Sequence, residues 1–363
     1  MGQEQLLSTL TTLRVGGVAK RVQRESDPRP LVQTVKQADQ EGVPLLLLGG
    51  GSNVVAADAP FPGLVLQDSR NRVLGVEERD GSVVVEVAAG TPWDQFVAET
   101  VERGWSGVEA LSGIPGSVGA GPVQNIGAYG RELSDNLVSV LAFDRQSGKT
   151  LTLSRDDLEL GYRDSLLKRS LFSKRPGQEL WASTPRWLVL SVKLRLGRDP
   201  LSAPIRYTEL ASRLGVEVGD RAQASAVREA VLDLRRSKGM VLDPADHDTW
   251  SAGSFFTNPM LSSAGAELLP EGAPRFLTKQ RTGEQKVKTS AAWLIDHAGF
   301  GRGWSLYPGA QASLSTKHVL AVTNRGHATT SDVVQLARAV RAGVAAKFGI
   351  TLVAEPVFIG IEL

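Results

Sequence analysis

The amino-acid sequence predicts an α+β protein of two domains, on three observations. Helix-like and strand-like segments alternate over roughly the first 60 residues, and strand-like segments then dominate to about residue 196, so the order is not an unbroken βαβ repeat. A turn-rich stretch, residues 197–200, follows, and helical periodicity resumes beyond it. With about 150 residues per domain as a guide, 363 residues accommodate two or three domains. We therefore expect one domain over residues 1–199 and a second over residues 200–363.

Four segments have the apolar spacing of an amphipathic helix: residues 31–38, 93–103, 227–234 and 333–348. The second of these carries the most start and stop signals. Thr91 is expected to be its N-cap, Pro92 its first residue and Asp94 the returning half of a capping box. Gly104 ends this helix, and Gly349 ends the fourth.

Enrichment in Val, Ile and Leu predicts four strands, over residues 83–88, 138–144, 187–196 and 351–361. In the last of these, strand alternation would put Glu355 on one face with Val353, Val357 and Ile359. Residues 262–288 are rich in Glu, Gly, Pro, Arg and Lys and are expected to form a surface loop.

Composition excludes several classes of function. The chain has no cysteine, which excludes disulfides, thiolate metal sites and a cysteine nucleophile. Its 41 basic and 39 acidic residues give a formal charge of +2, too balanced for a nucleic-acid-binding protein. The four histidines have no metal-ligand spacing, so no metal site is expected. The longest dense apolar run, residues 43–48, is far shorter than the roughly 20 residues of a membrane span, and no secretory signal is recognised; we expect a cytoplasmic protein without membrane insertion.

A first glycine loop follows this apolar run and comprises Gly49-Gly50-Gly51-Ser52-Asn53. Glycines permit positive φ and let main-chain N–H groups approach a ligand, so the loop can bind a phosphate, with Ser52 and Asn53 as further donors. It is neither a Walker loop nor a dinucleotide fingerprint, because the spacing of both is absent. The alternative is a tight connection between a strand and a turn, which is the favoured interpretation of this motif alone.

A second glycine loop covers residues 113–130, with a small residue at nearly every other position and two prolines. A stiff main chain with unobstructed N–H groups suits a diphosphate or the polar edge of a heteroaromatic ring. The alternative is that the glycines serve the close packing of crossing segments. The ligand interpretation is favoured, because packing alone would not require the amide pair Gln124 and Asn125.

Together the two loops resemble the MurB family, the UDP-N-acetylenolpyruvoylglucosamine reductases. The resemblance covers nearly the whole chain and rests on GGGSN, on IPGSVGAGPVQNIGAYG at 114–130, and on five further motifs: TTLRVGG at 11–17, GYRDS at 161–165, GSFFTNP at 253–259, AAWLIDHAG at 291–299 and AEPVFIG at 354–360. It implies a PCMH-type FAD-binding domain of two α/β subdomains, of the vanillyl-alcohol-oxidase type, over residues 1–199. A MurB-type α+β substrate domain would follow over residues 200–363, with the last strand, 350–361, returning toward the active site.

The resemblance implies the NADPH-dependent reduction of UDP-N-acetylglucosamine enolpyruvate to UDP-N-acetylmuramate through FAD, in peptidoglycan precursor synthesis. The implied partners are the UDP-sugar substrate and NADPH, and we expect a monomer. FAD is expected to be non-covalent, because the chain has no cysteine and neither loop contains a histidine. The residues implied to bind it lie in the two loops: Gly49, Gly50, Gly51, Ser52, Asn53, Gly116, Ser117, Gly119, Ala120, Gln124, Asn125 and Gly127. A flavin oxidase that uses O2 and a non-catalytic nucleotide-sugar or flavin-binding protein are the alternatives.

Three residues match the family's catalytic positions. Hydride addition to the enolpyruvyl group leaves an enediolate, which needs a cation at the carboxylate and an acid at the carbon. Arg163 supplies a planar, permanent cation that can bind a carboxylate through two bonds; its alternative is a salt bridge with Asp164 or Asp156. Ser254 is implied to be the proton donor, and the alternative is a hydroxyl satisfied by the main chain. Glu355 is implied to bind the enediolate or to orient Arg163 or a water molecule, and its alternative is an exposed edge-strand residue.

Three further residues are implied to bind the substrate. Lys238 would contact the diphosphate, although a basic residue at a helix C-terminus also complements the helix dipole, by a few tenths of a kcal/mol. Tyr207 would close over the same diphosphate, which places the chain in the longer class of the family. Asn258 would contact the substrate, and its alternative is a turn-forming asparagine.

Overall fold

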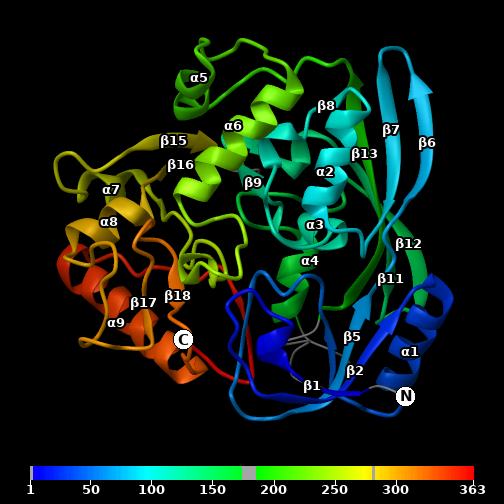
Figure 1. The fold of residues 1–363 in the computed structure, drawn as a ribbon, viewed down its shortest axis with the longest axis horizontal. Helices are drawn as coiled ribbons and strands as arrows, with labels where there is room; N and C mark the ends of the chain where they lie inside the picture. Colours follow the sequence, from blue (N-terminus) through cyan, green and yellow to red (C-terminus); the bar gives the residue numbers. More distant parts are fainter. Residues whose placement is uncertain (1–2, 174–184, 280–282) are drawn as a thin grey trace. The chain divides into compact units, whose positions relative to one another are not determined.

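The computed structural model describes residues 3–173, 185–279 and 283–363. The chain divides into two compact units, each taken over its described residues (Figure 1). The first unit comprises Met1–Gln5, Ala19–Gly50 and Pro62–Val241, and the second comprises Leu6–Val18, Gly51–Phe61 and Leu242–Leu363. Residues 200–241, which the sequence boundary near 199 puts in the substrate domain, therefore group with the first unit. The functional assignment of domains 1–199 and 200–363 stays a prediction.

A small sheet forms one part of the first unit. Its strand order is β1-β2-β5-β3, with β1 at Gln3–Leu6, β2 at Val18–Glu25, β5 at Phe61–Asp68 and β3 at Leu45–Leu47. Helix α1 (Pro28–Gln40) begins where the Asp27 carboxylate accepts a hydrogen bond from the Arg29 amide, at 2.8 Å. Leu31, Val35 and Ala38 of α1 pack on Leu45 and its neighbours, so the first predicted helix is confirmed.

A larger antiparallel sheet forms the other part of this unit (Figure 1). Its order is β12-β11-β13-β7-β6, with β8 also pairing β13. The bounds are β6 Val73–Arg79, β7 Ser82–Ala88, β8 Trp105–Ser106, β11 Leu137–Asp144, β12 Lys149–Ser154 and β13 Trp187–Arg198. The strands predicted at 83–88, 138–144 and 187–196 are confirmed. The short strands β9 (Gly127–Ala128) and β10 (Arg131–Glu132) pair separately.

Besides α1, the described α-helices of the first unit are α2 (Trp93–Glu102), α3 (Gly121–Gln124), α4 (Leu166–Arg169), α5 (Thr208–Leu214) and α6 (Ala224–Ser237). Helix α2 confirms the predicted helix, but the predicted capping box is wrong. Pro92 is the N-cap, and the Thr91 hydroxyl accepts a hydrogen bond from the Arg72 amide at 3.1 Å. The Asp94 carboxylate instead accepts hydrogen bonds from the Gly113 amide and from Arg228 on α6. Asp94 therefore holds the start of the second glycine loop and fixes α6 to α2.

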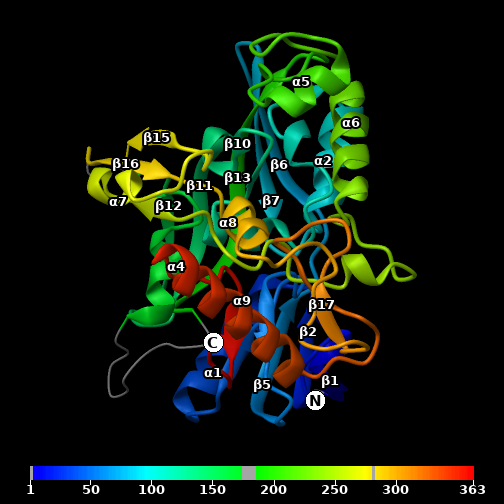
Figure 2. The same ribbon diagram turned by 90° about the vertical axis from the view of Figure 1, so that its left-hand side faces the viewer.

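The second unit is built around a core that includes Phe255, Phe256, Leu294 and Leu336. Its helices are α7 (Ser263–Glu267), α8 (Ala291–His297) and α9 (Thr330–Phe348), and α8 packs on α9 (Figure 2). Its strands are β4 Val54–Ala56, β14 Met260–Leu261, β15 Phe276–Lys279, β16 Gln285–Lys288, β17 Ala312–Leu314, β18 Val322–Asn324 and β19 Val357–Ile359. Helix α9 ends at Gly349 in the left-handed conformation, as predicted.

Two sequence predictions for this unit are wrong. The strand expected over 351–361 is regular only at β19, which pairs in parallel with β4. Pro356 has no N–H to donate to a ladder, and Val353 is 65% exposed whereas Ile359 is 3% exposed, so the expected alternation around Glu355 does not exist. Residues 262–288 are not a surface loop: outside residues 280–282, which are not described, they contain α7, β15 and β16. Across the described part of the chain, no helix combines the length and apolar character needed to cross a membrane.

Candidate active site

Arg163 lies in a tight turn of the first unit. Gly161 and Asp164 exchange main-chain hydrogen bonds at 3.0 and 3.2 Å, and Arg163 itself has a φ of +53°. This left-handed conformation directs the guanidinium to the second glycine loop, where Nη2 donates to the Gly127 carbonyl at 2.8 Å and Nη1 to the Asn125 carbonyl at 3.5 Å. Asp164, one alternative partner considered for Arg163, forms an ion pair with Arg169. The turn thus presents a permanent cation beside a loop implied to bind the cofactor.

Side chains also tie this turn to the second glycine loop. The Ser165 hydroxyl donates to the Val123 carbonyl at 2.7 Å and accepts from the Lys168 amide at 2.9 Å, which starts α4. The side-chain Nδ2 of Asn125 donates to the Gly161 carbonyl at 2.9 Å. Together with the two bonds of Arg163, these contacts hold GYRDS against residues 123–127.

The two glycine loops pack against each other within the first unit. A Cβ added to Gly50 would lie 2.7 Å from the Cα of Gly116, and one added to Gly49 would lie 2.8 Å from the Ser117 hydroxyl. A Cβ on Gly119 would lie 2.5 Å from that of Ala89. Close packing, the alternative considered for the second loop, therefore accounts for these glycines. It does not exclude a ligand, because the same close approach leaves main-chain donors without covering side chains.

Part of the second loop is already hydrogen-bonded inside the protein. The amide of Val118 donates to Thr91, that of Gly119 to Ala89 and that of Ala120 to Ser117, at 2.8, 2.8 and 3.0 Å. The expectation of unobstructed N–H groups does not hold for these three residues. If Gly119 and Ala120 contact a ligand, they do so through atoms other than their main-chain N–H groups.

The remainder of the first glycine loop belongs to the second unit. Gly51 has a φ of +62°, and an added Cβ would lie 1.9 Å from the Leu10 carbonyl oxygen, so only glycine fits. The side-chain Nδ2 of Asn53 donates to the Glu355 carbonyl at 3.3 Å, and the main-chain carbonyl of Asn53 accepts from the Val357 amide at 2.9 Å. Asn53 is thus bonded to the main chain on both sides of Pro356.

Ser254 and Glu355 lie on adjacent segments of the second unit. The Glu355 amide donates to the Phe255 carbonyl at 2.9 Å, and Phe256 and Ala354 form an antiparallel bridge. Both Ser254 and Glu355 are partly buried. Gly253, with a φ of +74°, makes the bend that precedes Ser254. The structure therefore brings together two of the three predicted catalytic residues within one unit, and the third, Arg163, lies in the other unit.

Tyr207 and Lys238, two of the predicted substrate-binding residues, are brought together in the first unit by a third side chain, Tyr129. The rings of Tyr129 and Tyr207 pack edge to face with centroids 5.6 Å apart, and the Lys238 ammonium lies 5.9 Å from the Tyr129 centroid. Lys238 follows the end of α6 and forms an ion pair with Glu209 at 2.6 Å. Asn258, in the second unit, accepts a hydrogen bond from the Ala291 amide at 3.0 Å and so supports the start of α8.

Sequence reasoning missed Tyr129, which lies in the second glycine loop, and Arg235, which adjoins it at Gly113. Burial raises the pKa of Tyr129 to about 12 and lowers the pKa of Arg235 to about 10, to which the charge of Arg163 contributes. Arg235 donates to the Met240 carbonyl at 2.8 Å, and its buried Nε has no hydrogen-bond partner among the described residues. A basic run at a helix end and a tyrosine closing a glycine motif were the available signals.

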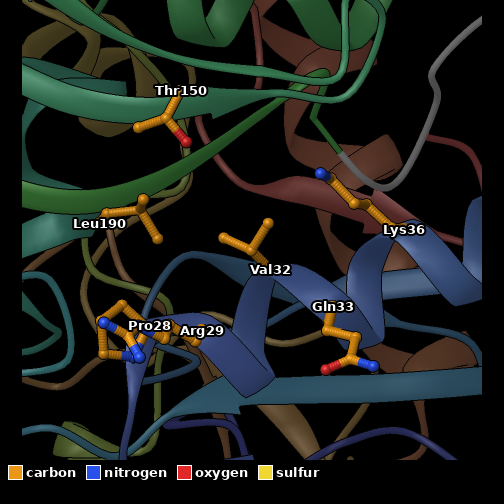
Figure 3. Close-up of a pocket in the computed structure, with 7 residues that line it drawn as sticks. All are labelled: Pro28, Arg29, Val32, Gln33, Lys36, Thr150 and Leu190. Atoms are coloured by element: carbon orange, nitrogen blue, oxygen red, sulfur yellow. The ribbon is translucent and has the colours of Figure 1, made fainter.

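A groove of about 440 Å³ elsewhere in the first unit contains none of the predicted site residues. Figure 3 shows that α1 forms one wall and that Thr150 and Leu190 lie opposite. Its lining has two cations, Arg29 and Lys36, two polar residues, Gln33 and Thr150, and three apolar residues. Nothing in it indicates catalysis.

Comparison with known families first defines a class of protein. Residues 21–154 match the FAD binding domain family, and residues 243–359 match the family described as UDP-N-acetylenolpyruvoylglucosamine reductase, C-terminal domain. The α+β fold class, with an FAD-binding domain followed by a MurB-type domain, is thereby confirmed.

Full-length relatives identify the family. The chain is 49% identical to UDP-N-acetylenolpyruvoylglucosamine reductase of Thermobifida fusca, over 98% of this chain and 97% of the relative. It is 50% identical to the enzyme of the same name from Salinispora arenicola, over 98% and 95%. The crystal structure of the Thermus caldophilus MurB has the same fold, with a TM-score of 0.64 at 24% identity and 99% coverage of both chains. The chain belongs to the UDP-N-acetylenolpyruvoylglucosamine reductase family.

Proposed function

We propose that this protein reduces UDP-N-acetylglucosamine enolpyruvate to UDP-N-acetylmuramate, with NADPH as the reductant and FAD as the cofactor. The observation that carries the proposal is 49% identity to a named reductase along nearly the entire length of both chains. The predicted catalytic residues comprise the cation, hydroxyl and carboxylate that the reaction requires. FAD, when bound, supplies a carrier for the hydride between NADPH and the enolpyruvyl group.

The two glycine loops fit a cofactor that contains a diphosphate. Within the first unit, residues 49–50 and 116–117 supply main-chain amides and the Ser117 hydroxyl, which are suitable donors to phosphate oxygens. Close approach of Gly50 to Gly116 leaves no space for a Cβ between the loops. The cofactor roles assigned to the remaining residues of both loops stay predictions. For Asn125 the role would fall to main-chain atoms, because its side chain bonds Glu132, Gly161 and Ser134. We expect non-covalent binding, because the chain has no cysteine and neither loop contains a histidine.

Arg163 is proposed to bind the carboxylate of the enolpyruvyl group and to stabilise the charge of the enediolate. Its support is preorganisation: the left-handed turn and the Gly127 carbonyl fix the guanidinium before substrate arrives. Ser254 is proposed to protonate the carbanionic carbon, and Glu355 to hydrogen-bond the enediolate or to orient Arg163 or a water. The roles of Ser254 and Glu355 are supported by their positions on neighbouring segments, which the hydrogen bond from the Glu355 amide to the Phe255 carbonyl joins.

Lys238 and Tyr207 are proposed to bind the substrate diphosphate. Both contact Tyr129, and Tyr207 is 44% exposed, so its ring is accessible to a ligand. Phosphate would replace Glu209 as the partner of Lys238, exchanging one anion for another. Asn258 is proposed to contact substrate through the amide group that also supports α8.

The finer biological assignments follow from the family. We infer a role in cell-wall biogenesis, cell shape and cell division through the peptidoglycan precursor. Monomeric state and cytoplasmic location are expectations that accompany this role.

Anaerobic half-reactions test the proposed function. NADPH is expected to bleach the bound flavin, and the enolpyruvyl sugar nucleotide is expected to restore its absorption. Reoxidation by O2 with a sugar or alcohol substrate, but not by the enolpyruvyl compound, would identify a flavin oxidase instead. Flavin that NADPH does not reduce and the substrate does not reoxidise would identify a binding protein.

A further inference from the structure

The side chain of Asn125 makes three hydrogen bonds within the protein. It follows α3, is 1% exposed and has a φ of +42°. We propose that the Asn125 side chain is a positioning residue for Arg163, holding the turn that carries the guanidinium. This inference rests on the proposed role of Arg163 and adds a residue that keeps the guanidinium in position for that role.

The hydrogen bonds of the Asn125 amide are made within the protein. Nδ2 donates to the Gly161 carbonyl and to Oε2 of Glu132, both at 2.9 Å, and Oδ1 accepts from the Ser134 amide at 3.0 Å. A side-chain amide has two protons to donate, so these two bonds use its donor capacity. A cofactor or substrate would therefore have to displace Glu132 or Gly161 to receive a hydrogen bond from this group.

The same residue contacts the Arg163 turn at two points. Its side chain bonds Gly161, the first residue of the turn, and its carbonyl accepts from Arg163 Nη1 at 3.5 Å. Gly161 has few steric restraints, and Arg163 adopts a conformation uncommon for residues other than glycine. The Gly161–Asp164 bonds join the ends of the turn, and the Asn125–Gly161 bond ties this turn to the second glycine loop. The Asn125 and Gly127 carbonyls define where the guanidinium lies.

Asparagine suits this position for two reasons. It is among the residues that tolerate the left-handed region, and it supplies donors to a carbonyl and a carboxylate together. Aspartate tolerates the same main-chain conformation but has no donor, and its charge would face Glu132. Asn125→Asp therefore removes the restraint on Gly161 with little steric change.

The test compares Asn125→Asp with Asn136→Asp in the FAD-bound protein. Asn136 is a matched control, because its Nδ2 donates to the Arg195 carbonyl at 2.8 Å on another segment. For Asn125→Asp we expect full flavin content, an unchanged rate of flavin reduction by NADPH, and a fall of about 100-fold in kcat/KM for the enolpyruvyl substrate, the size expected for a misplaced catalytic group. Loss of FAD, or an equal effect of Asn136→Asp, would overturn the proposal.

A double-mutant cycle separates positioning from general structural damage. If Asn125 acts through Arg163, Asn125→Asp should change kcat/KM by less than about threefold in an Arg163→Ala background. Full additivity of the two losses would contradict the proposal.

A crystal structure of Asn125→Asp gives a result independent of turnover, and so separates failure of this inference from failure of the proposed function. We expect Arg163 to leave the Gly127 carbonyl, to which it now lies at 2.8 Å. An unmoved guanidinium would overturn the positioning role even in an active enzyme. A displaced guanidinium in a wild-type protein that does not turn over would leave the positioning role standing and refute the proposed function.

Discussion

The Asp94 carboxylate fixes the start of the second glycine loop at Gly113. It accepts hydrogen bonds from the Gly113 amide at 2.5 Å and from two nitrogens of Arg228 at 2.6 and 2.9 Å. Burial disfavours its charge, but the bonds from Arg228 and Gly113 outweigh burial and lower the pKa of Asp94. Asp94→Asn keeps the shape and an acceptor for Gly113 while removing the charge.

The expected loss of stability in Asp94→Asn depends on how exposed the Asp94 and Arg228 side chains are. Hydrogen bonds to a charged group contribute about 1.5–3 kcal/mol, but the Asp94 side chain is 39% exposed and that of Arg228 17%, so solvent screening reduces the loss to about 1–2 kcal/mol. At about 2–4 °C per kcal/mol for a protein of this order of size, the Tm should fall by about 2–8 °C. Because the pKa of Asp94 is lower in the folded protein, its contribution is complete above the unfolded pKa, about 3.9, and is lost as pH falls through the folded value.

Thermal unfolding of wild type, Asp94→Asn and the control Asp233→Asn between pH 3 and 7 measures this contribution. Asp233 also pairs with arginines, at 2.9 and 3.2 Å, but its side chain is 49% exposed, so its substitution should lower Tm by less than about 2 °C. The difference between wild type and Asp94→Asn should shrink below about pH 4. A gap that stays constant with pH, or one no larger than that of the control, would refute this account of Asp94.

Three further outcomes are expected. Gly50→Ala should destabilise the protein by about 1–3 kcal/mol and lower its flavin content, because its Cβ would meet Gly116 at 2.7 Å; unchanged absorption and Tm would argue against the loop contact. Lys238→Met should raise KM for the sugar nucleotide by about tenfold or more with little change in kcat, as expected for a lost bond to phosphate, while Glu209→Gln should not raise KM. Acid precipitation should release the flavin into the supernatant, and colour that stays with the polypeptide would mean a covalent link.

Periodic patterns predicted the regular elements, because apolar spacing reports burial directly. The helix from Pro28 and the three long strands of the large sheet were found in this way. The capping box failed because Asp94 has stronger partners, Gly113 and Arg228, far away in sequence. No local pattern encodes a competition of this kind.

The candidate site was predictable where a motif is contiguous and not where contacts cross the chain. Arg163, Ser254 and Glu355 came from family motifs, whereas the part played by Tyr129 needs the folded positions of Tyr207 and Lys238. Sequence suggested glycines for ligand binding, and the structure shows that several also satisfy close packing. Ligand binding and close packing both favour glycine, so the amino-acid composition of a loop does not distinguish the two roles.

Single-turnover reoxidation of the reduced flavin tests the central claim most directly. Wild-type protein and Ser254→Ala are reduced anaerobically with NADPH and then mixed with the enolpyruvyl sugar nucleotide. The wild type is expected to recover its flavin absorption, whereas the variant is expected to be reduced normally and reoxidised at least about 100-fold more slowly, the contribution of a positioned general acid. Equal reoxidation of both proteins would contradict the role of Ser254, and absence of reoxidation in the wild type would contradict the proposed reaction.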